Sequence, residues 1–343
     1  MKIIIAILIF SVIILFHELG HFLLAKKNGI RVNEFCLGLG PTLVGFTKGE
    51  TKYSIHLLPF GGACMMEGED GDSTDERAFT NKSVWARIAV VAAGPVFNFI
   101  MAFIFSVILM ACIGYDKPVI SGVMEGYPAE AAGMQEGDTI LKMNNKHIHF
   151  CREINLYLYF HPGETVDITY ERGGEVKEVT LTPAHDEESG GYYVGFYESN
   201  ARTKVNAFEA LKYGAYYTKY WVDVTFESVR MLFTGKVGVQ DMSGPVGIVK
   251  TIGDTYEESK TDGAFYIFLN MLNISILLSA NLGVMNLLPI PALDGGRLVF
   301  LIIEAIRRKR IDPEKEGMVH FVGMMCLMAL MVFIMFSDIR KLF

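Results

Sequence analysis

Long apolar blocks dominate the pattern of hydrophobic and polar positions along this chain. Each block is uncharged, or nearly so, over enough residues to cross about 30 Å of hydrocarbon at about 1.5 Å per helical residue. A cleaved signal peptide does not explain the first block, because no small-residue cleavage site follows it. We therefore predict four membrane-spanning helices, at residues 3–25, 88–114, 263–293 and 317–337.

The stretches between these blocks have other patterns. Residues 35–46 are apolar and glycine-rich, which favours a re-entrant or interfacial piece. Residues 51–66 alternate and then reach Gly-Gly, which predicts a hairpin or edge strand beside the membrane. Residues 118–187 hold short β-rich runs around a helical stretch near 151–160. Residues 207–233 are aromatic-rich but interrupted by charges, so we predict an amphipathic interfacial helix there.

These elements predict a polytopic, mainly α-helical membrane protein with one inserted β-rich domain. Residues 1–117 are expected to form the first half of the membrane domain and residues 263–343 the second half. Between them we expect the inserted domain at 118–187 and an extracytoplasmic amphipathic or linker region at 188–262.

Composition excludes several other classes of protein. Hydrophobic residues make up 51% of the chain, charged residues 20%, and the mean hydropathy is +0.31, which excludes a disordered chain and disfavours a soluble one. The net charge is −7, without the basic stripe that a nucleic-acid partner requires. The five cysteines are scattered and include no CxxC, so neither a disulfide framework nor a zinc ribbon is expected.

Basic residues in the short loops predict the orientation in the membrane. Lys26, Lys27 and Arg31 follow the first span, and basic residues also fill positions 307–310 between the third and fourth. Both loops are therefore expected in the cytoplasm. Residues 118–262 and both termini are then expected outside it, in a multi-pass protein of the inner, or cytoplasmic, membrane.

A metal-binding motif lies inside the first apolar block. His17-Glu18-Leu19-Gly20-His21 is an HExxH motif, and residues four apart share one helix face, so both imidazoles can reach one metal ion. Glu18 beside them suits a general base toward the attacking water. Two histidines that only pack are the alternative, but polar groups are expensive to hold inside a membrane helix.

A catalytic zinc site usually has three protein ligands, so a third must come from elsewhere. Asp294 fits, because it follows the third apolar block at the end expected to face the cytoplasm. His17 lies about 21 Å along the first helix, near the same side of the membrane. The alternative makes Asp294 the N-cap of a following helix. The remaining histidines lack such partners and are interpreted as non-ligands: His56, His147, His149, His161, His185 and His320.

Two resemblances follow from these motifs. The run Gly126-Tyr-Pro-Ala-Glu-Ala-Ala-Gly-Met-Gln-Glu-Gly-Asp-Thr-Ile resembles a PDZ domain, a module that binds extended peptides as an added strand. HELGH, Leu-Asp294-Gly-Gly, four spans and one PDZ-like domain together resemble a site-2 intramembrane metalloprotease, most closely the bacterial RseP/RasP branch. The resemblance extends to Gly94-Pro-Val-Phe-Asn98 and to Ser243-Gly-Pro-Val-Gly-Ile.

The resemblance implies a zinc endopeptidase that cleaves transmembrane segments of single-span proteins, such as anti-sigma factors or signal-peptide remnants, within the lipid bilayer. It also implies that Asn281 and Asn286 contact the substrate backbone and that residues 51–66 clamp it as an added strand. Pro289 and Pro291 are expected to end regular helix before Asp294.

Two other classes remain open on the residues alone. The first is a non-catalytic membrane adaptor that binds peptides through its PDZ-like domain and carries a structural metal. Glu18 argues against it, because a structural site needs no base. The second is a metal transporter, which requires several acidic or histidine groups along a path through the bundle. The later spans offer only Asp294 and His320.

Overall fold

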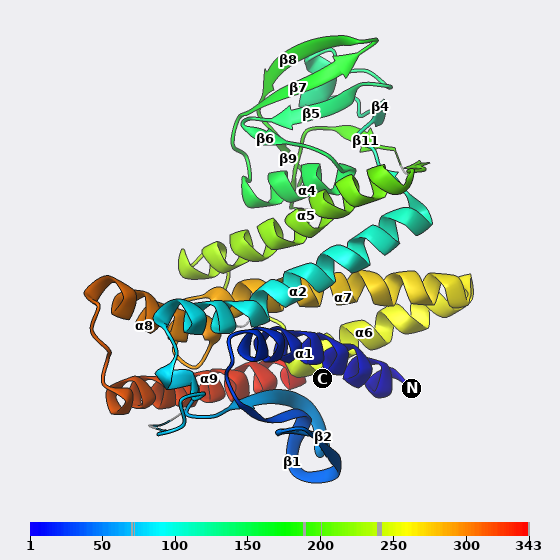
Figure 1. Ribbon diagram of the computed structural model, residues 1–343. Coiled ribbons are helices and arrows are strands. Elements are labelled where there is room, and N and C mark those ends of the chain that lie inside the picture. The colour runs from blue at the N-terminus through cyan, green and yellow to red at the C-terminus, as the bar shows by residue number, and fades with distance from the viewer. Residues whose placement is uncertain (70, 72, 188–189, 200, 239–241, 342–343) are drawn as a thin grey trace. The chain divides into compact units, whose positions relative to one another are not determined.

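The chain forms two compact units, each with its own core. Unit 1 comprises Met1–Phe105 and Ser228–Phe343, and unit 2 comprises Ser106–Glu227. The structure is a computed structural model (Figure 1), and it describes residues 1–69, 71, 73–187, 190–199, 201–238 and 242–341.

Helices make up most of unit 1 (Figure 1). Within the described residues, four helices are long and apolar enough to cross a membrane, as an integral membrane protein requires. Each predicted span falls on one of them. The α-helices are α1 (Lys2–Lys27), α2 (Val84–Ile113, which continues into unit 2), α6 (Pro245–Ser259), α7 (Ala264–Leu287), α8 (Asp294–Arg307) and α9 (Pro313–Arg340), with 3-10 turns η1 (Phe79–Asn81) and η3 (Lys260–Asp262). The four helices that could cross a membrane are α1, α2, α7 and Glu314–Arg340 of α9.

The third apolar block does not stay helical to its end. Helix α7 ends at Leu287, and Leu288 is extended at φ −63° and ψ 143°. The cause is Pro289, since the residue before a proline is pushed out of the α region. The prediction that the prolines end regular helix is confirmed. The extension of the span to residue 293 is wrong by six residues.

One face of α1 forms the centre of unit 1. Its buried residues recur at helical spacing: Ala6, Ile9, Ile13, His17, Gly20, His21 and Ala25. Ile9 and Ile13 share a core cluster with Met101, Ile252 and Ile274 of helices α2, α6 and α7. At Gly20 the backbones of α1 and α2 nearly touch, because a Cβ there would lie 2.4 Å from the carbonyl oxygen of Ala93.

A long hairpin connects α1 to α2. Strand β1 (Val32–Lys48) pairs antiparallel with β2 (Thr51–Met66), with bulges along its length. Residues 35–46, expected as a re-entrant or interfacial piece, therefore form a strand, and the strand expected within 51–66 is confirmed. Many apolar side chains of the hairpin are exposed, as a segment in contact with lipid requires: Leu39, Leu43, Val44, Phe46, Ile55, Leu57 and Leu58.

Helix α6 packs in unit 1 although it lies in the range expected as a linker. Ile252 on α6 joins the core cluster with α1 and α7. Its first turn receives a side chain from α9, because Gly247 N–H donates to Asp338 Oδ2 at 2.8 Å. Asp338 is buried, with 4% of its surface exposed, and thus ties the end of α9 to α6.

Unit 2 is β-rich, with a four-stranded sheet in the order β6-β5-β7-β8. The predicted β runs and the helix near 151–160 are confirmed, and residues 207–233 form a helix. The core cluster contains Ile120, Ile140, Met143, Ile154 and Ile168. The elements are β3 (Tyr115–Asp116), β4 (Ile120–Val123), α3 (Pro128–Ala131), β5 (Thr139–Met143), β6 (Lys146–His147), α4 (Cys151–Phe160), β7 (Val166–Arg172), β8 (Glu175–Leu181), β9 (Ala184–His185), β10 (Tyr192–Tyr193), β11 (Phe196–Glu198), β12 (Arg202–Thr203) and α5 (Ala207–Phe233).

Candidate active site

Helix α1 presents both histidines of the HExxH motif to one point. His17 and His21 lie one turn apart, and each is 8% exposed. Their Nε2 atoms are 3.2 Å apart. Two imidazole nitrogens that converge in this way inside an apolar helix are arranged to bind one metal ion.

Asp294 completes the group from another part of the sequence. It is the first residue of α8, and Leu293 rather than Asp294 is the N-cap residue. Its Oδ2 atom lies 3.1 Å from His17 Nε2 and 3.6 Å from His21 Nε2. Within the part of the chain that the structure describes, these three residues form the one group of metal-binding side chains close enough together to hold a metal ion.

The chemistry of this donor set fits zinc. Asp294 Oδ2 is buried and makes no hydrogen bond, although two imidazole nitrogens face it. Two imidazoles with one carboxylate are a common set for catalytic zinc.

Helix α2 fixes the orientation of both rings. The carbonyl oxygen of Val90 accepts a hydrogen bond from His21 Nδ1 at 2.9 Å, which leaves Nε2 unprotonated for a metal. The side-chain Nδ2 of Asn98 lies 3.1 Å from His17 Nδ1, and the amide Oδ1 is buried without a hydrogen-bond partner. A half-turn of the amide exchanges the two atoms, and Oδ1 then accepts the His17 Nδ1–H. Asn98 is fully buried. It is therefore the support that metal-bound histidines usually have.

Gly94 gives α2 the space to approach these rings. A Cβ at this position would lie 2.3 Å from His21 Nε2 and 2.7 Å from His17 Cε1. In the sequence, Gly94 and Asn98 belong to a motif that carries a family resemblance, and the motif alone predicts no role for either residue. One signal was available for Asn98, because a buried amide in an otherwise apolar membrane helix is costly unless it has a partner.

A cavity of about 690 Å³ opens beside the cluster and is lined by the predicted catalytic group. Glu18, His17, His21 and Asp294 all line it, as does Asn286. Asn281 lies on the same helix as Asn286, but it is not among the described residues that line the cavity. Asn286 therefore lies at the site, whereas Asn281 lies five residues earlier in α7 and does not line the cavity among the described residues.

The end of strand β2 forms one wall of the cavity, at residues 62–66. The strand passes close to the predicted base, because a Cβ on Gly62 would lie 3.3 Å from Glu18 Cγ. At the rim, Glu69 after β2 forms an ion pair with Arg297 of α8, and both residues line the cavity. The hairpin is therefore tied to the helix that carries Asp294.

Comparison with known proteins agrees with this site. Residues 5–330 match Peptidase family M50. A protein of Clostridium acetobutylicum that is named as a candidate zinc metalloprotease is 38% identical over 98% of this chain and 97% of its own length. The regulator of sigma-W protease RasP of Bacillus subtilis is 32% identical over 98% of this chain and 98% of its own length.

A solved PDZ domain of an SdrC-like protein from Listeria monocytogenes matches 25% of this chain and 90% of its own length, at 22% identity and a TM-score of 0.23. The family match covers most of the chain. It confirms the resemblance to a site-2 metalloprotease and the peptidase class expected from the motifs. A family match over most of the chain thus accompanies helices able to span a membrane, an HExxH motif and an acidic third member of the cluster, and the chain belongs to Peptidase family M50.

Proposed function

We propose that this chain is a zinc-dependent intramembrane endopeptidase that cleaves transmembrane segments of single-span proteins. One observation carries the proposal. His17, His21 and Asp294 converge within 4.8 Å of one another beside a cavity that Glu18 also lines, and two of the three belong to an apolar helix long enough to span a membrane.

Each residue has a separate role in this proposal. His17, His21 and Asp294 would hold the zinc ion, which when bound polarises the scissile carbonyl and lowers the pKa of water. Glu18 takes the proton of the attacking water and passes it to the leaving amine. Val90 and Asn98 keep the two imidazoles in the tautomer that a metal requires.

A substrate helix must unwind before it can be cut, because its backbone groups are satisfied by each other. Unwinding in hydrocarbon is costly unless other donors and acceptors replace those bonds. We propose that residues 51–66 supply them as an added strand, supported by the position of residues 62–66 in the cavity wall. Asn286 in that wall, and Asn281 farther along α7, are proposed to contact the substrate backbone.

The natural substrates are proposed to be anti-sigma factors or signal-peptide remnants. Support for the first comes from the Bacillus subtilis relative, whose name makes it a regulator of sigma-W. Residues 118–187 are proposed to be a PDZ-like domain outside the cytoplasm that selects among substrates. The membrane domain is then proposed to comprise 1–117 and 263–343, with the active site toward the cytoplasmic side of the inner membrane. Residues 188–262 are proposed to lie outside the cytoplasm, with α6 packed against α1 and α7.

Cysteine labelling with an impermeant reagent tests this orientation. Cys151 is not suitable, because it is 4% exposed and burial raises its pKa to about 12. Glu175→Cys is suitable, because the Glu175 side chain is 78% exposed. In intact cells Glu175→Cys should react and Lys309→Cys should not. Labelling of Lys309→Cys alone would reverse the orientation.

The central experiment separates metal binding from catalysis. Glu18→Gln keeps the size of the side chain but removes the proton acceptor. It should retain about one zinc ion per chain while activity falls on the order of 10²- to 10⁴-fold or more. Asp294→Ala should lose both zinc and activity, since two imidazoles hold zinc weakly. Glu175→Gln, at an exposed carboxylate, is the control.

Zinc analysis and cleavage of a single-span substrate in the same detergent decide between the outcomes. Loss of zinc from Glu18→Gln would make the glutamate a ligand. Full activity of Asp294→Ala would exclude it as the third ligand. A wild-type protein that binds zinc and peptides but cleaves no substrate would instead be a membrane adaptor with a structural metal.

A further inference from the structure

The loop that precedes Asp294 has a backbone conformation that does not form by itself. Residues 288–293 join α7 to α8 without regular structure, and Ala292 has a φ of +77°. L-amino acids with a Cβ rarely adopt this left-handed region. Such a conformation persists only where neighbouring groups hold it in place.

On one side the loop rests on the start of α8. A Cβ on Gly295 would lie 2.1 Å from the carbonyl oxygen of Leu288, and one on Gly296 would lie 2.4 Å from that of Ile290. The glycine pair after Asp294 therefore lets the loop fold back onto its own helix. These contacts are local, and they leave Pro291 and Ala292 to be held by another element.

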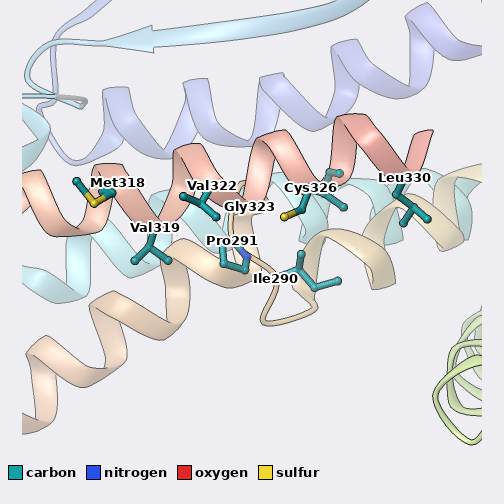
Figure 2. Close-up of a pocket in the computed structure, with 9 residues that line it drawn as sticks. Ile290, Pro291, Met318, Val319, Val322, Gly323, Cys326 and Leu330 are labelled. Atoms are coloured by element: carbon teal, nitrogen blue, oxygen red, sulfur yellow. The ribbon is translucent and has the colours of Figure 1, made fainter. Parts of the chain in front are cut away.

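Helix α9 contacts both of those residues. The N–H of Ala292 donates a hydrogen bond to His320 Nδ1 at 2.9 Å. A Cβ on Gly323 would lie 2.4 Å from Pro291 Cβ and 2.7 Å from the Pro291 carbonyl oxygen. Figure 2 shows Pro291 beside α9 next to Gly323. Both residues line an apolar pocket of about 560 Å³.

The imidazole of His320 is itself oriented by its surroundings. Its ring centroid lies 5.6 Å from that of Phe300 on α8, and its Nε2 lies 3.9 Å from Glu316 Oε1 one turn earlier on α9. Because the Ala292 amide can only donate, Nδ1 must be the unprotonated nitrogen of the ring. His320 is thus a fixed acceptor for the amide two residues before Asp294.

We propose that α9 positions the carboxylate of Asp294, with His320 and Gly323 as the positioning residues. Asp294 Oδ2 and the two histidine nitrogens can bind one ion only if the backbone at residues 291–293 is fixed. His320 fixes it by a hydrogen bond and Gly323 by close packing. Neither residue belongs to the cluster of His17, His21 and Asp294 or is among the described residues that line the cavity beside it. The inference rests on the proposed function, because it takes Asp294 as a ligand.

Three substitutions at His320 test the hydrogen bond. Leu has a similar size and no acceptor, Asn places its amide oxygen where Nδ1 lies, and Gln moves the oxygen to the position of Nε2. Zinc affinity, measured by competition with a chromophoric chelator in detergent, should fall roughly tenfold in His320→Leu and His320→Gln. It should stay within about twofold of wild type in His320→Asn. With zinc saturating, kcat should fall in the same order while KM for a single-span substrate is unchanged.

Two alanine substitutions on the same helix test the packing. Gly323→Ala forces a methyl group into Pro291, whereas a Cβ on Gly317 meets nothing within 4 Å. Gly323→Ala should weaken zinc binding roughly tenfold or more, since a displacement of about 1 Å is costly at a catalytic site. Gly317→Ala should behave as wild type. This pair also decides the matter if His320→Leu fails to fold.

The inference is overturned if His320→Leu and Gly323→Ala both keep wild-type zinc affinity and kcat. It is also overturned if His320→Asn is as damaged as His320→Leu, because the hydrogen bond would then be irrelevant. The proposed function fails under different results. It fails if the wild-type protein binds no zinc, or if it cleaves no substrate that the Glu18→Gln variant leaves uncleaved.

Discussion

Gly94→Ala introduces one methyl group at the point where α2 packs against His17 and His21, the proposed metal ligands. By helix propensity alone the change should stabilise α2, by about 1 kcal/mol in an exposed helix. The site predicts the opposite effect on function. The new Cβ would lie 2.3 Å from His21 Nε2 and 2.6 Å from its Cε1. A normal contact is about 3.5 Å, so either the helices separate or the ring moves by about 1 Å.

That displacement is large compared with what a metal site tolerates. Ligand distances must hold to about 0.2 Å, and a misplacement of about 1 Å costs on the order of 10²-fold in rate. We therefore expect Gly94→Ala to fold normally while its zinc affinity and its cleavage rate each fall about 100-fold. The control is Gly71→Ala, where a Cβ meets nothing within 4 Å.

Zinc affinity by chelator competition, cleavage of a single-span substrate and the thermal unfolding midpoint, all in one detergent, give the answer. Wild-type affinity and rate in Gly94→Ala would show that α2 does not press on the histidines as described. An equal loss in Gly71→Ala would attribute the effect to glycine replacement in general.

Asn98 and Glu198 are two buried or half-buried polar side chains whose surroundings only the structure reveals. Asn98→Leu removes the amide beside His17 Nδ1 and should weaken zinc binding about 10- to 100-fold at unchanged thermal stability, as chelator competition would show. In unit 2, burial and then the nearby carboxylate of Asp116 raise the pKa of Glu198 from 4.5 to about 7. The folded chain thus keeps a proton that the unfolded chain releases, and stability falls as pH rises through that window, by on the order of 2 kcal/mol after screening. Glu198→Gln should flatten this dependence, and equal hydrogen-exchange protection of residues 106–227 at pH 5 and pH 8 in wild type would contradict it.

Features that depend on local periodicity could be predicted from the amino-acid sequence. Apolar blocks of span length specify helices wherever they occur, because only a helix satisfies its backbone in hydrocarbon. The spacing of His17 and His21 places both rings on one face of α1 for the same local reason. Loop charges together with helix length also indicated Asp294, because a third ligand must lie at the same depth in the membrane as His17.

Features that depend on contacts between distant segments could not be predicted from the sequence. Strand β1 was not recognised, because its pairing with β2 compensates for its glycines only once the hairpin has formed. The supports of the site at Val90, Gly94 and Asn98 exist only because α2 packs against α1 at Gly20. His320 on α9 reaches Ala292 across 28 positions of sequence, and no local pattern encodes such a contact. Periodicity therefore fixes the elements and the helix face that carries His17 and His21, while close packing between helices fixes the positions of the proposed metal ligands.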